Sequence, residues 1–531
     1  MTKPDRPLAM LFAVLAACAV AVAQDSTLAP AQPMVPPTAS APVGEVPPPQ
    51  EKLPAPANPI PASAPAQPEL TLDECIARAL KKNFDLEIAR YNPAIAEDAI
   101  QVAKAGLDPT LTLTSTRTFS QQAASLSELD GSPSPTSDNT NTRLAVSEKI
   151  ATGATVGLST QLNRAANNSS FNTLNPAFNS AATVSVSQPL LRGFGMEVTK
   201  ASIRRAEIGL KRANLDFKTQ AVTVIESVEN AYYNLTFARE QLAVFRASLE
   251  LANKLYSEAQ TRRDTGVATD LDVLSAQVGV ANARGNVIQA EQADKDRQDA
   301  LLALVGQGDL DEKVGTVRFP AVESAAPVFV SSYQLALQNQ PAYLSAAAAI
   351  EQYRIDLKLA KNARLPSLAV GGAYGLAGRK GSAGAAYDQL PNHDGYNWEV
   401  DLSLSVPIGF RGDKAVYRQT LATLNREEAR LRQLEQNIQV QVRSAVRAVE
   451  ANMEGVSIAQ LAAELSQKQY ELEKARFDAG LSTSYRVLQA QTDLDNAQVK
   501  ELQARVTLNS AISALHRIEG SSLHRYHVDL H

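Results

Sequence analysis

Side chains that could carry out chemistry are few in this sequence. Four of its five histidines lie in the last 16 residues, and only the run His524-x-x-His527-x-x-x-His531 has spacing suggestive of metal ligands. Such a cluster at a chain end is more typical of a tail than of a metal site. No phosphate-binding loop, nucleophile elbow or CxxC pair occurs. We therefore expect a protein that is not an enzyme, with no catalytic residue, cofactor or metal.

Composition points to thin helical packing and away from nucleic acid. The formal net charge is only −5 over 531 residues, which gives no sign of nucleic-acid binding. Aromatic residues make up 5% of the chain. This composition suits coiled-coil packing better than one thick globular core.

One stretch of the chain occurs twice. Residues 477–491 repeat residues 263–277, and the shift of 214 positions places Gly266 on Gly480. In each copy a long helical pattern runs into the glycine, and a Ser/Thr/Asp cluster then starts a new helix. Each copy therefore predicts the tip of a helical hairpin. The tip residues are Gly266, Val267, Ala268 and Thr269 in the first copy and Gly480, Leu481, Ser482 and Thr483 in the second.

The two hairpins are expected to be long and asymmetric. Their apolar positions step by four and three residues, which is the seam of a coiled coil. Each returning helix is half as long as the helix before it, and a short helix is expected to stack end to end on it. The expected helices span about 86–107, 199–264, 270–305, 342–364, 413–478 and 484–518.

Between the helices, the period changes from 3.6 to 2. In six runs apolar and polar residues alternate, most clearly from Trp398 to Ile408. Each run has the length at which a tilted strand crosses a bilayer. A sheet in a soluble protein would alternate in the same way, but polar loops and an export signal favour the membrane. The expected strands are 110–119, 142–150, 155–163, 183–191, 367–376 and 397–408, with loops at 121–141, 164–180 and 377–395.

The N-terminus predicts export. Lys3 and Arg6 precede an apolar run that is too short to span a membrane, as in a secretory signal. Two cleavage sites remain open: signal cleavage after Ala23, or lipid attachment to Cys18 with residues 1–17 removed. The following Pro/Ala-rich segment, 24–69, is expected to be an extended linker. Cys75 would be left without a disulfide partner.

This order of elements resembles the TolC-like outer membrane efflux protein family (outer membrane factors) over about 70 to 520. The resemblance rests on Phe477-x-x-Gly480-x-x-Thr483-x-x-x-Val487-Leu488-x-Ala490, its copy at 263–276, and the passages Gln188-Pro-Leu190 and Val406-Pro-Ile408. It implies an α+β fold of outer-membrane β-barrel strands joined to a long periplasmic α-helical coiled-coil barrel. The fold would have an internal two-fold repeat and be trimeric.

The same resemblance implies a function. A homotrimer in outer membrane lipid would form a passive exit duct for a tripartite efflux or type I secretion system. Its tips would meet a periplasmic adaptor (membrane fusion) protein, and an inner-membrane pump of the RND, ABC or MFS type would supply the substrate. Open strand edges independently favour several copies, because unpaired backbone groups in lipid cost several kcal/mol each. The alternative is a periplasm-spanning structural or adaptor coiled-coil protein.

Two features differ from the family pattern. Some relatives have two strands in each half, whereas four are expected here in the first half, so a trimer would have eighteen strands instead of twelve. Well-studied members also have acidic rings near the tips, but the aligned residues here are Arg486 and Gln489, with Asp272 and Ser275 in the first half. The candidate constriction is therefore an Asp272–Arg486 pair across neighbouring hairpins, and the alternative is two solvated charges.

The expected domains follow from these patterns. They are a signal peptide at 1–23, a linker at 24–69, a first repeat at 70–308, a connector at 309–332, a second repeat at 333–520 and a C-terminal tail at 521–531.

Overall fold

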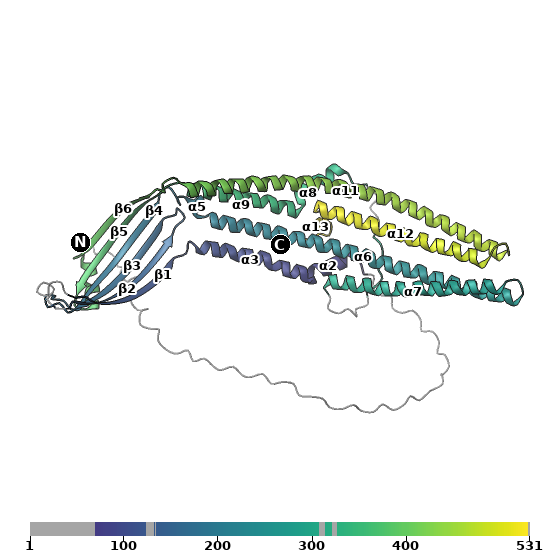
Figure 1. Cartoon of the computed structure of the whole chain (residues 1–531), viewed down its shortest axis with the longest axis horizontal. Coiled ribbons are helices and arrows are strands. Elements are labelled where there is room, and N and C mark those ends of the chain that lie inside the picture. The colour runs from purple at the N-terminus through teal and green to yellow at the C-terminus, as the bar shows by residue number, and fades with distance from the viewer. Residues whose placement is uncertain (1–69, 124–131, 133, 307–313, 321–325, 529–531) are drawn as a thin grey trace, which may run out of the picture. The chain divides into compact units, whose positions relative to one another are not determined.

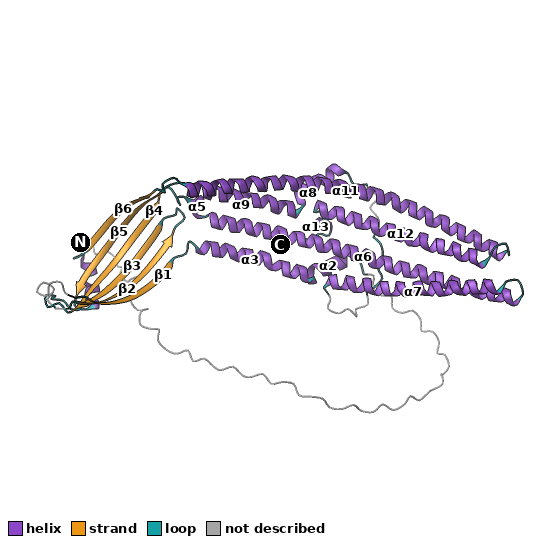
Figure 2. Cartoon of the chain, in the orientation of Figure 1, coloured by secondary structure: helices purple, strands orange, loops and turns teal. Residues whose placement is uncertain are grey.

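The long helices and the strands occupy separate parts of the folded chain in the computed structural model (Figures 1 and 2). The structure describes residues 70–123, 132, 134–306, 314–320 and 326–528. The signal segment, both cleavage sites and the linker lie outside these residues. Among the described helices, none is both long enough and apolar enough to cross a membrane.

Six antiparallel strands form one sheet in the order β1-β2-β3-β4-β5-β6, so each strand pairs with its neighbours in the chain. Because β4 pairs with β5, the sheet joins the two halves of the repeat across the long helical segment between them. The strands are β1 Thr110–Gln121, β2 Thr136–Lys149, β3 Thr155–Asn167, β4 Ala177–Pro189, β5 Ser367–Lys380 and β6 Tyr396–Ser405.

The strand register sorts side chains onto two faces of the sheet. One face, which we call the apolar face, carries a band of apolar side chains. On the side away from the long helices this band ends at the row of paired residues that runs from Leu113 through Leu144 to Leu376 and Tyr396. The opposite face carries Thr, Ser and Asn with Glu399 and Asp401. On β6 the apolar side chains are widely exposed, Trp398 at 70% and Val400 at 72%. Apart from the short helices α10 (Ala383–Asp388) and η1 (Leu390–Asn392), which pack on β4 and β5, no described element covers the sheet, which does not fit a sheet buried in a soluble protein.

Two long hairpins form the repeated helical part. The first pairs α6 (Ala201–Asp264) with α7 (Asp270–Val305), and the second pairs α11 (Arg411–Asp478) with α12 (Ser484–Glu519). The predicted seam of α6 is buried at Val224, Val228 and Leu235. Ile438 and Val442 are buried in the same way in α11. The mixed fold with its internal repeat is therefore confirmed.

Short helices complete the length of the returning helices. In the first half α2 (Leu72–Lys82) and α3 (Phe84–Ala105) pack on α6. The side chain of Asn83 links α7 to α3. Its Nδ2 donates a hydrogen bond of 2.8 Å to the carbonyl of Leu304 at the end of α7, and its Oδ1 caps the start of α3. In the second half α8 (Phe329–Asn339) and α9 (Pro341–Ala363) pack on α11.

Contacts order the helices into a layer. Next to the sheet the neighbours run α3, α6, α9 and α11, and toward the tips they run α7, α6, α12 and α11. The helix α6 is therefore interior, whereas α3, α7 and α11 lie at the edges of the layer.

Several boundaries differ from the sequence prediction because turn-rich composition hides strand ends. The strands β2 and β4 begin at Thr136 and Ala177, inside the expected loops, and the last loop contains α10 (Ala383–Asp388) and η1 (Leu390–Asn392). The helix α8 begins at Phe329, inside the expected connector. A four-residue helix, α5 (Met196–Thr199), precedes α6.

The C-terminal segment, expected as a tail, makes contacts with the helices. It forms α13 (Ser522–Arg525), and the Tyr526 hydroxyl donates to the carboxylate of Glu229 on α6. The residues His524 and His527 lie here, while His531 is outside the described part of the chain.

Candidate functional site

The two hairpin tips reverse the chain in the same way. Gly266 and Gly480 have φ values of 76° and 75°, which disfavour residues with a Cβ. In the first tip the Val267 N–H donates to Arg262 O at 2.8 Å, and in the second the Leu481 N–H donates to Arg476 O at 2.8 Å. These bonds close each long helix with a left-handed glycine and satisfy its last carbonyls. The repeat therefore encodes one backbone geometry twice.

The helices that leave the tips start differently. Thr269 Oγ1 accepts from the Asp272 N–H at 3.3 Å, and Asp272 Oδ2 accepts from the Thr269 N–H at 3.0 Å, which makes a capping box at the start of α7. Thr483 occupies the same position before α12 but makes no side-chain cap bond. Ser482 Oγ instead donates to Glu473 on the preceding helix.

Apolar side chains project from both tips. Val267 is 75% exposed and Leu481 is 73% exposed. One turn further, Leu271 and Tyr485 are also exposed at equivalent positions of the repeat. Each tip therefore presents an aliphatic side chain followed by a second large apolar one, with little charge between them.

Contacts between the two tips were missed by the sequence reasoning. The Arg262 guanidinium lies 4.0 Å from the ring centre of Phe477, and its Nη1 donates to Phe477 O at 2.8 Å. The Ser484 hydroxyl donates to the Asp272 carbonyl and carboxylate, both at 3.3 Å. The sequence does contain one hint of these contacts. Phe477 and Arg263 occupy equivalent positions of the repeat, and this difference marks a place where the two tips are not alike.

The four candidate constriction residues lie on the first turns of α7 and α12. Asp272 and Ser275 are half-buried, whereas Arg486 and Gln489 are exposed. Within the described part of one protomer no ion pair joins Asp272 to Arg486, and the expected pair across neighbouring hairpins stays a prediction. The Asp272 carboxylate is already held by Thr269 and Ser484. The backbone and hydroxyl of Thr269 are the main cause of its lowered pKa.

The described residues contain no group of three His, Cys, Asp or Glu side chains placed to hold a metal ion. Cys75 is fully buried and unpaired, and desolvation raises the pKa of its thiol to about 12. A thiol held in its neutral form is a poor nucleophile.

Comparison with known proteins agrees with this architecture. The sequence profile of the family described as "Outer membrane efflux protein" matches residues 151–307 and 332–521. The pyoverdine export outer membrane protein OpmQ of Pseudomonas aeruginosa is 25% identical over 333 residues, covering 60% of this chain and 66% of that protein. The chain thus spans just under two thirds of OpmQ.

Two further comparisons point the same way. The outer membrane protein TolC of Vibrio cholerae is 25% identical over 335 residues, 59% of this chain and 73% of that protein. The CmeC outer membrane channel of Campylobacter jejuni has a similar fold, with a TM-score of 0.63 and 16% identity over 85% of each chain. Because the family profile matches more than half of its residues, the chain belongs to the outer membrane efflux protein family.

Proposed function

We propose that this protein is the outer membrane channel of a tripartite efflux or type I secretion system. It acts as a passive exit duct for substrates handed on by an inner-membrane pump of the RND, ABC or MFS type through a periplasmic adaptor. The observation that carries this proposal is one chain that combines a sheet with a largely exposed apolar face and two long hairpins with apolar tips. Relatives named for pyoverdine export and for toxin and drug export support it.

The sheet supports a homotrimer. Its first and last strands, β1 and β6, have no partner on their outer edges within the described chain. With six alternating strands, β1 of one copy runs antiparallel to β6 of the next, and apolar residues of both strands lie on the same face. Three copies would close eighteen strands into one barrel and satisfy the edge groups that lipid cannot.

The helical edges support the same neighbour contact. On α11 the side chains Ile458, Leu465 and Leu472 recur every seven residues and are 56–65% exposed. Near the same end, α7 exposes Leu271 and Leu274. Packing α7 of one copy on α11 of the next would bury both stripes as a coiled-coil seam.

The tips are proposed as the adaptor-docking surface. Gly266→Val combined with Gly480→Val should strain each reversal by about 1–2 kcal/mol. A Cβ at either glycine meets no atom within 4 Å, so the sheet and the barrel should be unaffected. We expect oligomers to remain in the outer membrane while export and adaptor crosslinking are lost. Normal export by the double variant would refute docking through these tips.

The constriction is proposed to form between copies. Arg486 is exposed and has no ion-pair partner among the described residues, so its guanidinium is free to approach Asp272 of a neighbouring copy, whose carboxylate also contacts Thr269 and Ser484. Arg486→Asp should then raise single-channel conductance, and Asp272→Arg combined with Arg486→Asp should restore closure. Unchanged conductance in the single variant would reject the pair.

The anchoring of the N-terminus is a separate proposal. Mass spectrometry of the mature protein and of a Cys18→Ser variant distinguishes the two cleavage sites. An acylated wild-type N-terminus lost in the variant would support lipid attachment, whereas two identical termini at Gln24 would support cleavage after Ala23.

Fractionation tests the channel itself. Detergent extracts of outer membranes should contain heat-resistant trimers that conduct ions in planar bilayers. Recovery of the protein in the soluble periplasmic fraction would overturn the proposal and favour a structural coiled-coil tether.

A further inference from the structure

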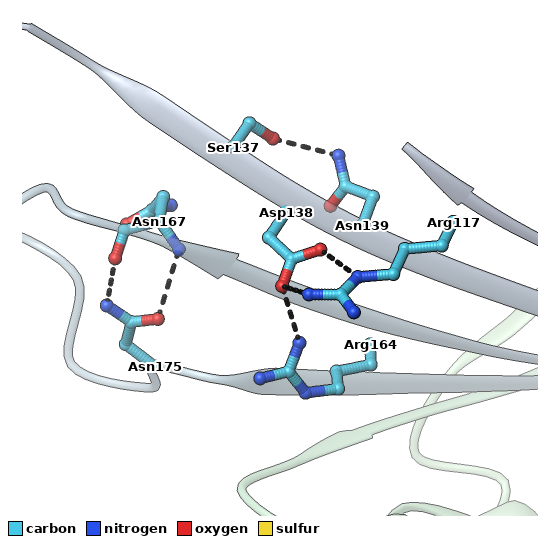
Figure 3. Close-up of polar contacts among 7 residues, drawn as sticks. All are labelled: Arg117, Ser137, Asp138, Asn139, Arg164, Asn167 and Asn175. Carbon is cyan, nitrogen blue, oxygen red and sulfur yellow. Dashed lines mark hydrogen bonds and ion pairs between the residues drawn. The ribbon is translucent and has the colours of Figure 1, made fainter. Parts of the chain in front are cut away.

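A charged cluster lies on the apolar face near the outer ends of β1, β2 and β3. The Arg117 guanidinium binds the Asp138 carboxylate through two hydrogen bonds, Nε to Oδ1 at 2.9 Å and Nη2 to Oδ2 at 3.0 Å (Figure 3). From the next strand, Arg164 Nη1 reaches Asp138 Oδ2 at 3.2 Å. One carboxylate therefore holds two guanidinium groups side by side and leaves a net charge of +1.

The strand register places this cluster just beyond the apolar band. The band ends at Leu113 on β1 and at Leu144 on β2, and on β3 Leu162 lies one row beyond them. Beyond it, one row of the sheet carries Arg117, Thr140, Arg164, Phe178 and Lys380 on the same face. Three basic groups thus follow the apolar band on the side away from the helices, with Phe178 between two of them.

The two arginines keep donors for a ligand. Arg117 is 69% exposed and Arg164 is 39% exposed, whereas the Asp138 that orients them is only 20% exposed. Among the described residues, Arg117 Nη1 and Arg164 Nη2 have no hydrogen-bond partner. Guanidinium groups fixed in this way suit phosphate oxygens, which accept paired, charge-assisted hydrogen bonds.

We infer that this cluster binds a phosphate group of a lipid in the outer leaflet of the membrane. The inference rests on the proposed outer-membrane location. The apolar band marks the depth of the acyl chains, so the basic row beyond it lies at the level of the headgroups. A lipid explains why charged groups occupy the same face as the band, since its acyl chains would cover Leu113 and Leu144 while its phosphate meets Arg117 and Arg164.

The position of β1 gives the lipid a structural role. Because β1 is an edge strand, a lipid held by Arg117 lies next to the seam with the neighbouring copy. A bound lipid should therefore raise the temperature at which the oligomer dissociates.

The test uses the full-length protein purified in detergent, with a bis-phosphorylated disaccharide lipid of the lipid A type as the probe. The variant Arg117→Gln with Asp138→Asn and Arg164→Gln removes the charges together, so that no carboxylate is left unpaired. Native mass spectrometry should show lipid affinity reduced about tenfold or more, because charge-assisted hydrogen bonds are lost. The stabilisation of the oligomer by added lipid should disappear with it.

Arg143→Gln is the matched control. Arg143 lies on β2 but on the polar face, where its Nη2 donates to Ser159 at 3.4 Å. This variant should keep wild-type lipid affinity. Undiminished lipid affinity in the triple variant would overturn the inference. Equal binding of a dephosphorylated lipid, or equal stabilisation by inorganic phosphate alone, would overturn it as well.

The inference and the proposed function fail separately. The triple variant should conduct ions like the wild type, since its substitutions lie on the outer surface of the barrel. A wild-type protein that binds the phosphorylated lipid but forms no conducting pore would overturn the proposed function and support the lipid site.

Discussion

The two long helices come from one repeated unit but have different surroundings. The helix α6 packs against α2, α3, α7, α9 and α12, and its exposed positions carry no large apolar side chain. The main contacts of α11 with described elements are those with α8, α9 and α12, and it exposes Val440, Ile458, Leu461, Leu465 and Leu472. The two copies keep the same backbone. Their positions in the layer differ, so other helices of the same chain cover α6 on more sides than they cover α11.

Side chains at equivalent positions follow the same difference. Glu229 of α6 is 3% exposed and accepts a hydrogen bond from Tyr526. Its equivalent 214 positions later is Arg443, which lies exposed on α11 with its guanidinium 4.9 Å from the ring centre of Phe329. The interior helix α6 thus carries a buried polar contact at this position, whereas the edge helix α11 carries an exposed arginine beside an aromatic ring.

The largest loss of stability is expected at the two junctions where α7 and α12 end against the short helices. Gly306 and Gly520 both have positive φ, at 75° and 70°. A Cβ on Gly306 would overlap the Lys82 carbonyl group, whereas on Gly520 it would lie 2.7 Å from the Asn339 carbonyl. Gly306→Ala should therefore destabilise more than Gly520→Ala, and each should cost more than the about 1–2 kcal/mol of the positive φ alone.

Thermal unfolding followed by circular dichroism in detergent measures both variants. Gly285→Ala is the control, because Gly285 lies inside α7 with no atom within 4 Å of an added Cβ. It should stabilise α7 by about 0.5–1 kcal/mol. Equal behaviour of all three variants would show that the two junctions do not constrain the fold.

The next effect concerns the buried carboxyl of the interior helix. Desolvation raises the pKa of Glu229 above its ordinary value of 4.5, and Glu226 adds to this, while Tyr526 and Arg525 oppose it. The folded state therefore binds more protons than the unfolded state between pH 4.5 and the raised pKa. Stability should fall as pH rises through this window and stay level above it.

Glu229→Gln removes this pH dependence while keeping an acceptor for Tyr526. The variant should match the wild type near pH 4 and exceed it in stability at pH 8, as measured by urea unfolding across the pH range. The control is Glu427→Gln on α11, a half-buried carboxylate whose pKa is lowered, chiefly by a hydrogen bond from Arg426. A wild-type profile unchanged by Glu229→Gln would contradict the assignment.

A smaller effect separates the two tips. Arg262 bridges the hairpins through Phe477, whereas its equivalent Arg476 makes only an exposed pair with Glu473 of its own helix at 3.5 Å. Arg262→Ala should loosen the second tip by about 1–2 kcal/mol, seen as faster hydrogen exchange at the amides of 478–481. Arg476→Ala should change exchange by less than about 0.5 kcal/mol. Equal effects would show that the tips are independent.

The smallest effect tests the two helix starts. Thr269→Ala removes a capping box and should destabilise the start of α7 by about 1 kcal/mol. Thr483→Ala removes no side-chain cap bond and should leave α12 nearly unchanged. Hydrogen exchange at the first turns of α7 and α12 compares them directly, and a larger loss at Thr483 would reverse the interpretation.

The sequence alone determined what local pattern controls. Seam residues such as Val228 and Val442, the glycine reversals at 266 and 480, and the alternation from Trp398 to Leu404 all express short-range periodicity or φ preference, and each predicted its element correctly. Strand ends were missed because Ser, Thr and Asn occur in both loops and polar strand positions, as at Thr136 in β2.

Only the tertiary structure decided which long-range contacts these elements make. Nothing in the repeat says that α6 becomes interior and α11 an edge, because equivalent seams can pack on different neighbours. The contacts of Arg262 with Phe477 and of Tyr526 with Glu229 join residues 215 and 297 positions apart. Such pairs are set by the packing of whole helices, and a pattern with a period of a few residues carries no information about them.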